Sequence, residues 1–79
     1  MNIRVQYYAL LREQAGCSEE AVQTGARTPR ELYAELAGRH PFSLGVESLR
    51  VAVNAEFGDW GQQLAEGDAV VFIPPVAGG

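Results

Sequence analysis

Residues 69–79 read AVVFIPPVAGG, and this stretch decides the fold that the sequence predicts. Its first part, residues 70–73, is an uninterrupted apolar run of strand length, which is typical of a central β-strand covered on both faces. Pro74 and Pro75 then end the strand, because a proline cannot donate to a sheet ladder and holds the residue before it in extended geometry. We therefore predict a central last strand that runs straight into an extended tail.

The tail, which consists of Val76, Ala77, Gly78 and Gly79, contains no polar side chain. Its reactive group is the carboxylate of Gly79, and the two glycines lack the Cβ that would keep a narrow channel from closing around them. From Pro74 to Gly79 the extended chain reaches about 20 Å, at roughly 3.3–3.6 Å per residue. Glycines also end frayed chains, but a frayed end is normally polar, whereas this one is apolar and joined to a buried strand. The sequence thus favours a tail that inserts into a partner's cleft, with Gly79 as the reacting residue.

Length and composition bound the rest of the interpretation. A chain of 79 residues is expected to form a single domain, which we place at residues 1–75, with 76–79 as a flexible tail. No apolar run approaches the ~20 residues of a membrane span, and no basic segment followed by an apolar one marks a signal peptide, so we expect a cytoplasmic protein with no membrane partner. The one cysteine, Cys17, cannot form an intramolecular disulfide, which is compatible with a reducing compartment.

The net charge of −4 argues against nucleic acid as a partner and favours a protein with a basic surface. All six basic residues are arginines, and the chain has no lysine. This bias reflects either compositional drift or a need to keep side-chain amines away from an activated Gly79. His40 has neither a second histidine nor a cysteine cluster to complete a metal site. We therefore expect His40 to be a solvated residue at a helix end, with no metal and no tightly bound cofactor.

The segments before the main helix predict two strands and a short helix. Residues 2–8 alternate apolar and polar side chains, as a half-covered strand does. Residues 10–14 favour a short helix that ends at Gly16 in left-handed geometry. Residues 19–23 form a weaker strand whose polar side chains suit a sheet edge, with Ala21 as its inward residue.

The main helix begins with the strongest local signal in the chain. Thr28 is its N-cap, Pro29 occupies the first helical position and Glu31 closes a capping box. Apolar side chains spaced three and four residues apart form one stripe of the helix, made of Leu32, Tyr33, Leu36 and Ala37. Gly38 and Pro41 end the helix.

The segment between the main helix and the last strand predicts a loop and a hairpin. Two apolar residues of the loop at 41–48 are expected to lie against the sheet edge, Phe42 and Leu44. Residues 49–53 form a strand, and Asn54 takes the left-handed position of a tight turn into residues 56–57. Trp60 follows in a turn, where we expect it to be partly buried.

The order strand, short helix, strand, main helix, hairpin, final strand predicts an α+β protein of the β-grasp, ubiquitin-like class. Its mixed sheet has four to five strands, with one main helix and a short helix after the first strand. The first and last strands lie side by side in parallel at the centre of the sheet, which explains the apolar run at 70–73.

Several stretches of the chain resemble one known family. They are FIPPVAGG at 72–79, YYALLRE at 7–13, TPREL at 28–32 and the pattern Leu64…Gly67-Asp68-Ala69-Val70. Taken together, with a likeness that covers nearly the whole chain, they resemble the small subunit of molybdopterin synthase, a ubiquitin-like sulfur carrier.

The resemblance implies a role for the tail and for the residues at its base. An E1-like enzyme would use ATP to adenylate Gly79, and sulfur supplied through a partner would convert it to a thiocarboxylate. The residues that line the insertion path into the large subunit are Pro74, Pro75, Val76, Ala77 and Gly78. Three further residues match positions that contact partners: Tyr8, where phenylalanine is more usual, Arg12, and Ile73, which replaces another apolar residue. The chain is then a non-catalytic carrier subunit of a heterotetrameric synthase.

The implied chemistry agrees with first principles. A carboxylate is a poor electrophile because its anionic oxygen will not leave, and joining it to AMP supplies a leaving group that sulfur can displace. The resulting thiocarboxylate is a soft anionic nucleophile that can attack a pterin precursor held by the large subunit. The sequence offers no plausible pair of nucleophile and base, so we expect the catalytic side chains on the partners. We expect Cys17 to be a structural thiol rather than the sulfur donor.

Three other functions stay open on the sequence alone. A related carrier for thiamin, cysteine or tRNA thiolation shares the tail and the fold. A ubiquitin-like protein modifier would join Gly79 to lysines of target proteins. A plain interaction module would leave the terminal glycines dispensable.

Overall fold

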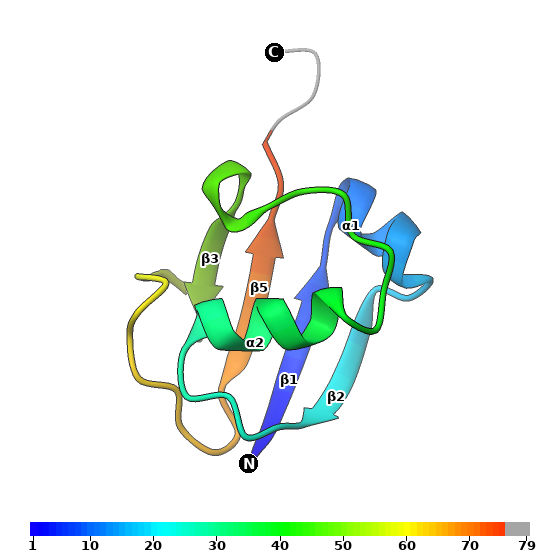
Figure 1. Cartoon of the computed structure of the whole chain (residues 1–79). Coiled ribbons are helices and arrows are strands. Elements are labelled where there is room, and N and C mark those ends of the chain that lie inside the picture. The colour runs from blue at the N-terminus through cyan, green and yellow to red at the C-terminus, as the bar shows by residue number, and fades with distance from the viewer. Residues whose placement is uncertain (76–79) are drawn as a thin grey trace.

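The computed structural model describes residues 1–75, and the predicted tail at 76–79 lies outside the described residues. The elements follow the predicted order (Figure 1). They are β1 (Asn2–Tyr7), α1 (Ala9–Ala15), β2 (Glu19–Gln23), α2 (Pro29–Ala37), the 3₁₀ turn η1 (Val46–Ser48), β3 (Arg50–Val53), β4 (Glu56–Phe57) and β5 (Ala69–Ile73).

The strands form one mixed sheet in the order β2-β1-β5-β3-β4. The central pair, β1 and β5, is parallel, with Tyr7 opposite Phe72, and the other pairs are antiparallel. Helix α2 crosses one face of this sheet, and α1 lies at the end where β1 and β5 both finish (Figure 1). The predicted β-grasp fold is confirmed, with β5 at the centre of the sheet.

Helix α2 begins at the predicted cap, with one difference in its hydrogen bonds. The Thr28 side chain accepts from the Glu31 backbone N–H at 3.2 Å, as a capping box requires. The Glu31 carboxylate, however, accepts from the Arg27 N–H at 2.8 Å rather than from that of Thr28. The carbonyl of Arg27 in turn accepts from the Leu64 N–H at 2.8 Å. The cap therefore reaches one residue further back and joins the helix to the segment that leads into β5.

The core lies between α2 and the face of the sheet that α2 covers. The helix contributes Leu32, Tyr33 and Leu36, all buried, while Ala37 is exposed, so the apolar stripe is narrower than predicted. The sheet contributes its inward residues, which include Ile3, Val5, Tyr7, Val22, Val51, Val53, Val70 and Phe72.

The inward residue of β2 is Val22, and the prediction of Ala21 was wrong. Val22 is buried and pairs with Ile3 of β1, whereas Ala21 is exposed. Because side chains alternate along a strand, the register with β1 decides which of the two neighbours faces the core. The predicted place of β2 at the sheet edge is confirmed.

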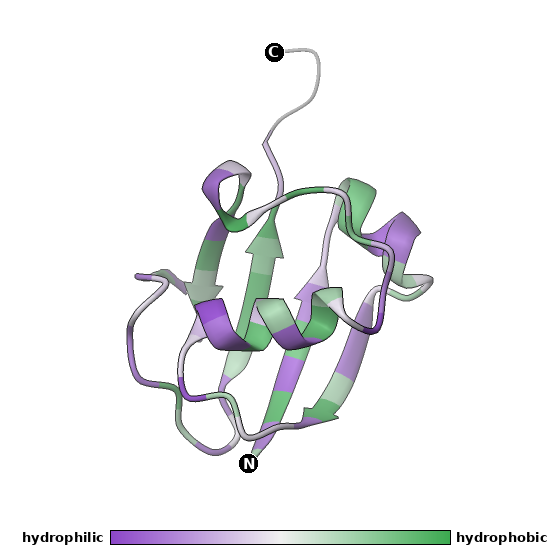
Figure 2. Cartoon of the chain, viewed as in Figure 1, coloured by the Kyte–Doolittle hydropathy of each residue, from purple (hydrophilic) through white to green (hydrophobic). Residues whose placement is uncertain are grey.

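The two faces of β5 differ, and the prediction that both are covered was wrong. Val70 and Phe72 have 0% exposure under α2, whereas Val71 and Ile73 are only half-buried on the opposite face. Figure 2 shows the strand as apolar along its whole length. An apolar run shows that a strand avoids water on both faces, but the second face can be apolar for contact with another protein.

Aromatic stacking fixes the loop between α2 and β3. Phe42 stacks on Tyr33, with ring centroids 5.4 Å apart and an interplanar angle of 9°. The Tyr33 hydroxyl donates to the Leu44 carbonyl at 2.6 Å. Phe42 and Leu44 are thus packed against the core, as predicted, although their anchor is a helix residue rather than the sheet edge. Trp60 is partly buried, also as predicted, and stacks on Phe72 at 5.8 Å and 7°.

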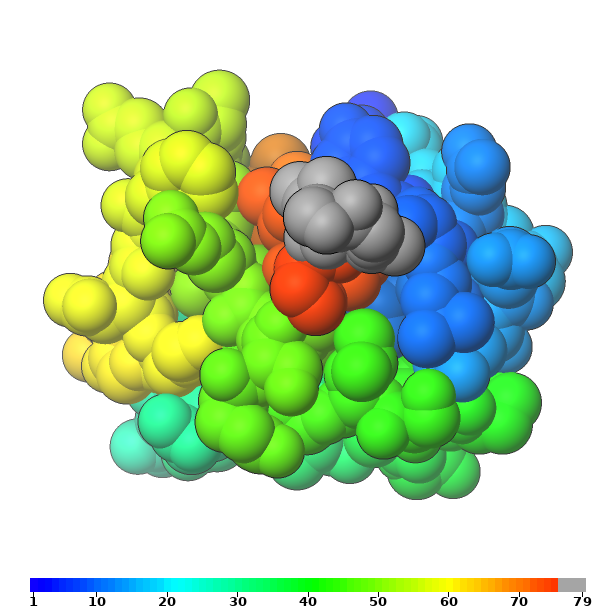
Figure 3. Space-filling view, turned by 90° about the horizontal axis from the view of Figure 1, so that it is seen from above, coloured from blue at the N-terminus to red at the C-terminus, as the bar shows by residue number. Residues whose placement is uncertain are grey.

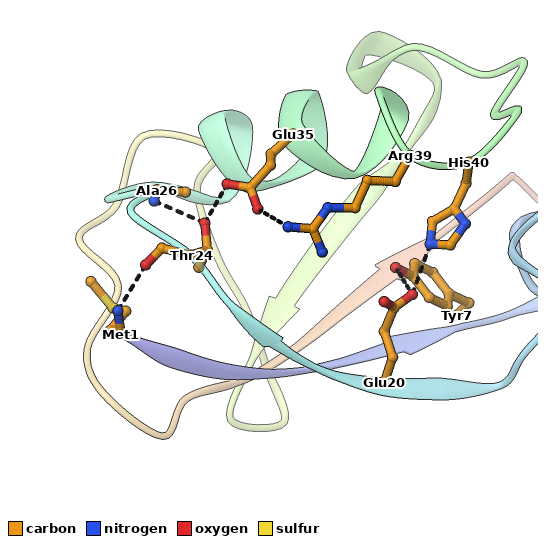
Figure 4. A network of polar contacts seen from close by, with 8 residues as sticks. All are labelled: Met1, Tyr7, Glu20, Thr24, Ala26, Glu35, Arg39 and His40. Carbon is orange, nitrogen blue, oxygen red and sulfur yellow. Dashed lines mark hydrogen bonds and ion pairs between the residues drawn. The ribbon is translucent and has the colours of Figure 1, made fainter.

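The environment of His40 differs from the solvated helix end that the sequence predicts. Its Nε2 atom lies 2.8 Å from a carboxylate oxygen of Glu20, and that oxygen also accepts from the Tyr7 hydroxyl at 2.9 Å (Figure 4). The His40 ring packs edge-on to Tyr7, with centroids 5.9 Å apart. A carboxylate of the edge strand, twenty residues away in sequence, therefore draws the side chain against the body of the protein.

Candidate functional site

The candidate site is the end of the sheet from which the tail leaves. Since β1 and β5 are parallel, β5 ends beside the start of α1. Pro74 is buried and Pro75 is exposed. Seen from above in Figure 3, the last described residues, in red, lie between the blue surface of the α1 region and the green surface of the loop before β3. The tail therefore starts from a fixed base at the middle of this end.

An apolar groove of ≈670 Å³ lies on the α1 side of this base. It is lined by Tyr8, Ala9, Leu10, Glu13, Leu44, Ile73, Pro74 and Pro75. Tyr8 is 51% exposed and Leu10 is 39% exposed, although both are large side chains with apolar bodies. The backbone turns from extended geometry at Tyr8 to a left-handed conformation at Ala9, with φ of +50°, which costs an alanine about 1 kcal/mol. This corner presents Tyr8 and Leu10 beside the tail.

A second groove, of ≈460 Å³, lies on the other side of the tail base. It is lined by Glu47, Ser48, Leu49, Arg50, Ile73, Pro74 and Pro75. Its charged residues make it more polar than the first groove. The two prolines and Ile73 thus form a ridge between an apolar groove and a polar one.

The open face of the sheet continues the apolar groove. A shallow depression of ≈460 Å³ on this face is lined by Gln6, Tyr8, Ala52, Asn54, Ala55, Phe57, Ala69, Val71 and Ile73. Phe57 is 69% exposed, and the Arg50 guanidinium lies over its ring at 5.7 Å from the centroid. We call five of the apolar residues of this surface the docking face: Tyr8, Ala52, Phe57, Val71 and Ile73. Exposed apolar patches of this kind mark sites of contact with other proteins.

The structure brings four of the predicted site residues together. Tyr8, Ile73, Pro74 and Pro75 line the same apolar groove. Arg12 is exposed on α1 and lines neither groove nor the docking face. The predicted residues Val76, Ala77, Gly78 and Gly79 lie outside the described residues.

Sequence reasoning missed several residues of the site, of which Leu10, Phe57 and Leu44 are large and apolar. Leu10 and Phe57 are exposed beside a chain reversal, and Leu44 lines the apolar groove. The sequence carries a signal for Leu10 and Phe57, because a large apolar residue next to a helix start or within a short hairpin can be expected to be exposed. This signal could have indicated both residues as part of a binding surface. Leu44 carries no such signal, because its place depends on the Tyr33 hydrogen bond to its carbonyl.

Two titratable side chains near this end, Cys17 and Tyr7, have raised pKa values. Burial, and then the neighbouring Glu20 carboxylate, raise the pKa of the Cys17 thiol. Burial, and then the hydrogen bond to Glu20, raise the pKa of the Tyr7 hydroxyl. Both groups stay protonated at neutral pH, and a thiol is a far weaker nucleophile than a thiolate. In the described part of the chain, therefore, the site offers surfaces for binding rather than an activated nucleophile.

Metal sites and membrane-spanning helices can be assessed for residues 1–75. In that range no three His, Cys, Asp or Glu side chains come together as a possible metal site. Neither described helix has the length and apolarity needed to cross a membrane.

The chain is similar over its full length to curated proteins from an alga and a bacterium. It is 36% identical over 83 residues to the molybdopterin synthase sulfur carrier subunit of Chlamydomonas reinhardtii, with 100% of both chains covered. It is 32% identical over 80 residues to the protein of the same name from Escherichia coli K12, which covers 98% of this chain and 99% of that one.

Solved structures share the fold. Small archaeal modifier protein 1 of Haloferax volcanii superposes with a TM-score of 0.83 at 28% identity, with 100% of both chains covered. A chain from the complex of subunits 1 and 2 of the molybdopterin-converting factor of Helicobacter pylori superposes with a TM-score of 0.71 at 24% identity, again over 100% of both chains, and this likeness concerns the fold alone.

The sequence model described as the ThiS family matches residues 5–79, which is almost the entire chain. The match includes the strand β5, both prolines and the Gly-Gly end. Together with the two curated relatives, it confirms the resemblance on which the expected site residues rest. This chain belongs to the ThiS family.

Proposed function

We propose that this protein is the sulfur carrier of a molybdopterin synthase. An E1-like enzyme adenylates the carboxylate of Gly79 at the expense of ATP, and sulfur then displaces AMP to leave a thiocarboxylate. The tail inserts into the large synthase subunit, where the thiocarboxylate donates its sulfur to a pterin precursor. The observation that carries the proposal is the docking face, which runs without interruption into the apolar groove at the base of the tail.

The geometry of the base suits a tail that is delivered by its partner-binding surface. Pro74 is buried against the body of the protein, so the free segment begins at the exposed Pro75. The four residues beyond Pro75 span at most about 14 Å, at ~3.3–3.6 Å each. A partner that acts on Gly79 must therefore cover the base of the tail, and the docking face and the apolar groove are the surfaces that it would cover.

The division of chemistry between carrier and partner also follows from the site. A thiocarboxylate needs no general base to act as a nucleophile, because it is already anionic at neutral pH. Two of the titratable groups at this end, the Tyr7 hydroxyl and the Cys17 thiol, are kept protonated by burial and by Glu20. Catalytic side chains then belong to the activating enzyme and to the large subunit, and this chain supplies position and reach.

The relatives support this function over the alternatives. Two proteins that match this chain end to end at 32% and 36% identity are named molybdopterin synthase sulfur carrier subunits. The Helicobacter pylori neighbour was solved as a complex of two subunits, which agrees with a large-subunit partner here. A second candidate is a protein modifier that joins Gly79 to lysines of other proteins, and it is favoured by the superposition on small archaeal modifier protein 1.

The test is sulfur loading followed by sulfur transfer. The protein is incubated with its activating enzyme, Mg-ATP and a sulfur source, and intact-mass spectrometry is expected to show exchange of one oxygen for sulfur at Gly79. The loaded carrier, mixed with the large subunit and pterin precursor, is expected to form molybdopterin. Two variants should lose transfer: one extra residue after Gly79, which moves the reacting group by roughly 3.5 Å, and Gly78→Val, which places a branched side chain where the channel closes.

Matched controls separate insertion from folding. Gly61→Val makes the same substitution at an exposed glycine whose added Cβ would meet nothing within 4 Å, and it should transfer sulfur at the wild-type rate. Circular dichroism and the melting temperature should be unchanged in every variant. Wild-type transfer by the extended chain or by Gly78→Val would refute insertion. An unchanged mass after incubation, with the enzyme active on another carrier, would refute the sulfur-carrier function. Covalent adducts with many cellular proteins would favour the modifier.

A further inference from the structure

The basic residues of this chain are six arginines, with no lysine. This matters for any protein whose carboxylate passes through an activated form. An amine that attacks the activated carbonyl carbon forms a C–N bond while the C–O bond to AMP breaks; AMP leaves with the electron pair and the ammonium proton goes to solvent. The product is a stable amide, which removes the carrier from its cycle. Guanidinium groups stay protonated and do not take part in this reaction at neutral pH.

The chain's alkyl amine is that of Met1, and the fold holds it in a hydrogen bond. It donates a hydrogen bond to the Thr24 carbonyl at 2.7 Å and is partly buried (Figure 4). The Thr24 N–H returns a bond to the Met1 carbonyl at 2.9 Å. The Thr24 hydroxyl is itself fixed, because it donates to Glu35 at 2.6 Å and accepts from the Ala26 N–H at 2.9 Å. To react, this amine must first give up its hydrogen bond to the Thr24 carbonyl.

The topology also separates the Met1 amine from the tail. In the parallel pair of β1 and β5, Arg4 lies opposite Ala69. Met1 and Pro75 are therefore at opposite ends of the sheet, about nine residues of strand or roughly 30 Å apart at ~3.3 Å per residue. The residues beyond Pro75 span at most about 14 Å. The tail cannot reach its own Met1 amine.

The remaining strong nucleophile, Cys17, is within reach but is turned inward. It precedes β2, which begins at the end of the sheet where β1 finishes, two strands away from β5. Neighbouring strands are ~4.8 Å apart, so the lateral distance is roughly 10 Å. The Cys17 sulfur, however, is half-buried against the core and lies 3.8 Å from a Glu20 carboxylate oxygen. A carboxylate at this distance opposes formation of the thiolate that would attack.

We propose that this chain is an acyl donor only: neither its own nucleophiles nor those of a second copy capture the activated carbonyl of Gly79, which is left for sulfur or for a nucleophile of a different protein. The inference rests on the proposed function to the extent that Gly79 is activated in the cell. It adds that the carrier neither cyclises nor forms chains of itself. It holds for activation by AMP and by a thioester alike, because the carbonyl carbon meets the same nucleophiles.

The test uses the full-length chain with Gly79 converted to a thioester by intein chemistry, so no activating enzyme is required. Arg50→Lys introduces an amine at a residue that lines the polar groove together with Pro74 and Pro75. Arg27→Lys is the matched control, because it makes the same change in the segment between β2 and α2, which runs along the opposite end of the sheet (Figure 1). Samples of the native protein are taken over time. Intact-mass spectrometry measures hydrolysis and cyclisation, and gel electrophoresis detects dimers.

Wild type and Arg27→Lys should lose the thioester by hydrolysis, with no cyclic product. Arg50→Lys should form the cyclic amide, lighter than the hydrolysed chain by one water, at least about tenfold faster than either, because an amine held near the carbonyl has a high effective concentration. Cyclic or dimeric amide from native wild type at the rate of Arg50→Lys would overturn the proposal. Equal rates for Arg50→Lys and Arg27→Lys would also overturn it, since access to an amine would then not control capture.

Cys17 is tested with the same thioester. In denaturant the wild-type chain should pass the acyl group to Cys17, a product that Cys17→Ser cannot form, and native protein should show at least about tenfold less of it. Equal capture in the native and unfolded states would contradict protection by the fold. These results are independent of the proposed function: failure of enzymatic adenylation would refute the carrier role and leave the thioester outcome intact, whereas native self-capture would refute donor-only behaviour and leave sulfur loading possible.

Discussion

Neighbouring residues with similar side chains differ strongly in solvent exposure between the two faces of the sheet. Tyr7 is 1% exposed beneath α2, and Tyr8, the next residue, is 51% exposed at the tail base. Phe72 is fully buried, whereas Ile73 is half-buried and lines both grooves. The apolar area of the covered face is buried on folding, whereas the open face keeps exposed apolar area that only another protein can cover. Apolarity alone therefore does not distinguish a core residue from a docking residue.

The largest expected effect on stability is at the covered face. Phe72→Ala removes a ring that stacks on Trp60 at 5.8 Å and meets Tyr33 edge-on at 5.1 Å. Truncation of a buried phenylalanine costs about 3–5 kcal/mol, which is comparable with the whole stability expected of a domain of this size. Urea denaturation followed by circular dichroism should therefore show a largely unfolded or barely stable variant. A loss below about 1 kcal/mol would mean that the ring is not a core residue.

Substitution of the adjacent residue, Ile73, should affect partner binding more than stability. Ile73→Ala removes a half-buried side chain, so the free energy of unfolding should fall by only roughly 1–2 kcal/mol, less than the 2–5 kcal/mol of a fully buried site. Binding of the large synthase subunit, measured by calorimetry, should weaken by about tenfold or more, which corresponds to ~1.4 kcal/mol. Unchanged affinity would remove Ile73 from the docking face.

Alkaline pH tests the burial of Tyr7 on the covered face. Burial, with the hydrogen bond to Glu20, raises the pKa of Tyr7 above its unfolded value of ~10. A group whose pKa is raised by folding stabilises the protein fully below the unfolded pKa, and this stability is lost as pH rises above ~10. Stability measured as a function of pH should therefore decline above pH ~10, and the decline should be smaller in Tyr7→Phe.

The decline should persist in part in that variant, because burial also raises the pKa of Tyr33. At neutral pH, Tyr7→Phe should cost about 1.5–3 kcal/mol, the usual range for a hydrogen bond to a charged group. An identical alkaline decline in wild type and Tyr7→Phe would show that the Tyr7 hydroxyl does not titrate differently in the folded state.

The smallest effect on stability is expected on the open face away from the tail. Phe57 is 69% exposed, and surface substitutions usually change stability by less than about 0.5 kcal/mol. Phe57→Ala should leave the urea midpoint almost unchanged and should reduce affinity for the large subunit less than Ile73→Ala does. A stability loss comparable with that of Phe72→Ala would erase the distinction between the two faces.

Local signals were sufficient to predict most of the fold. The cap at Thr28, the alternation in β1 and the prolines after β5 each act through their own backbone, so one sequence is enough to identify them. The same holds for the hairpin turn, where Asn54 has a φ of +52° as expected. Tyr8, Ile73 and the prolines at the tail base were predicted as site residues through the family resemblance, which extends over these positions.

The features that could not be predicted depend on residues distant in sequence. His40 meets Glu20 only because the loop after α2 folds back over the edge strand. The choice of Val22 over Ala21 depends on the register with β1. The open face was missed because alternation shows which residues share a face but does not show whether a second layer covers that face.

The parallel pairing of β1 with β5 has a practical consequence. The two ends of the described chain lie at opposite ends of the sheet, so a tag or surface attachment joined to Met1 would lie on the side away from the grooves. An amide N–H at that position can still donate to the Thr24 carbonyl, as the amine does at 2.7 Å. The protein can thus be immobilised through Met1 with both grooves at the base of the tail presented outward, as single-molecule and surface-binding measurements require.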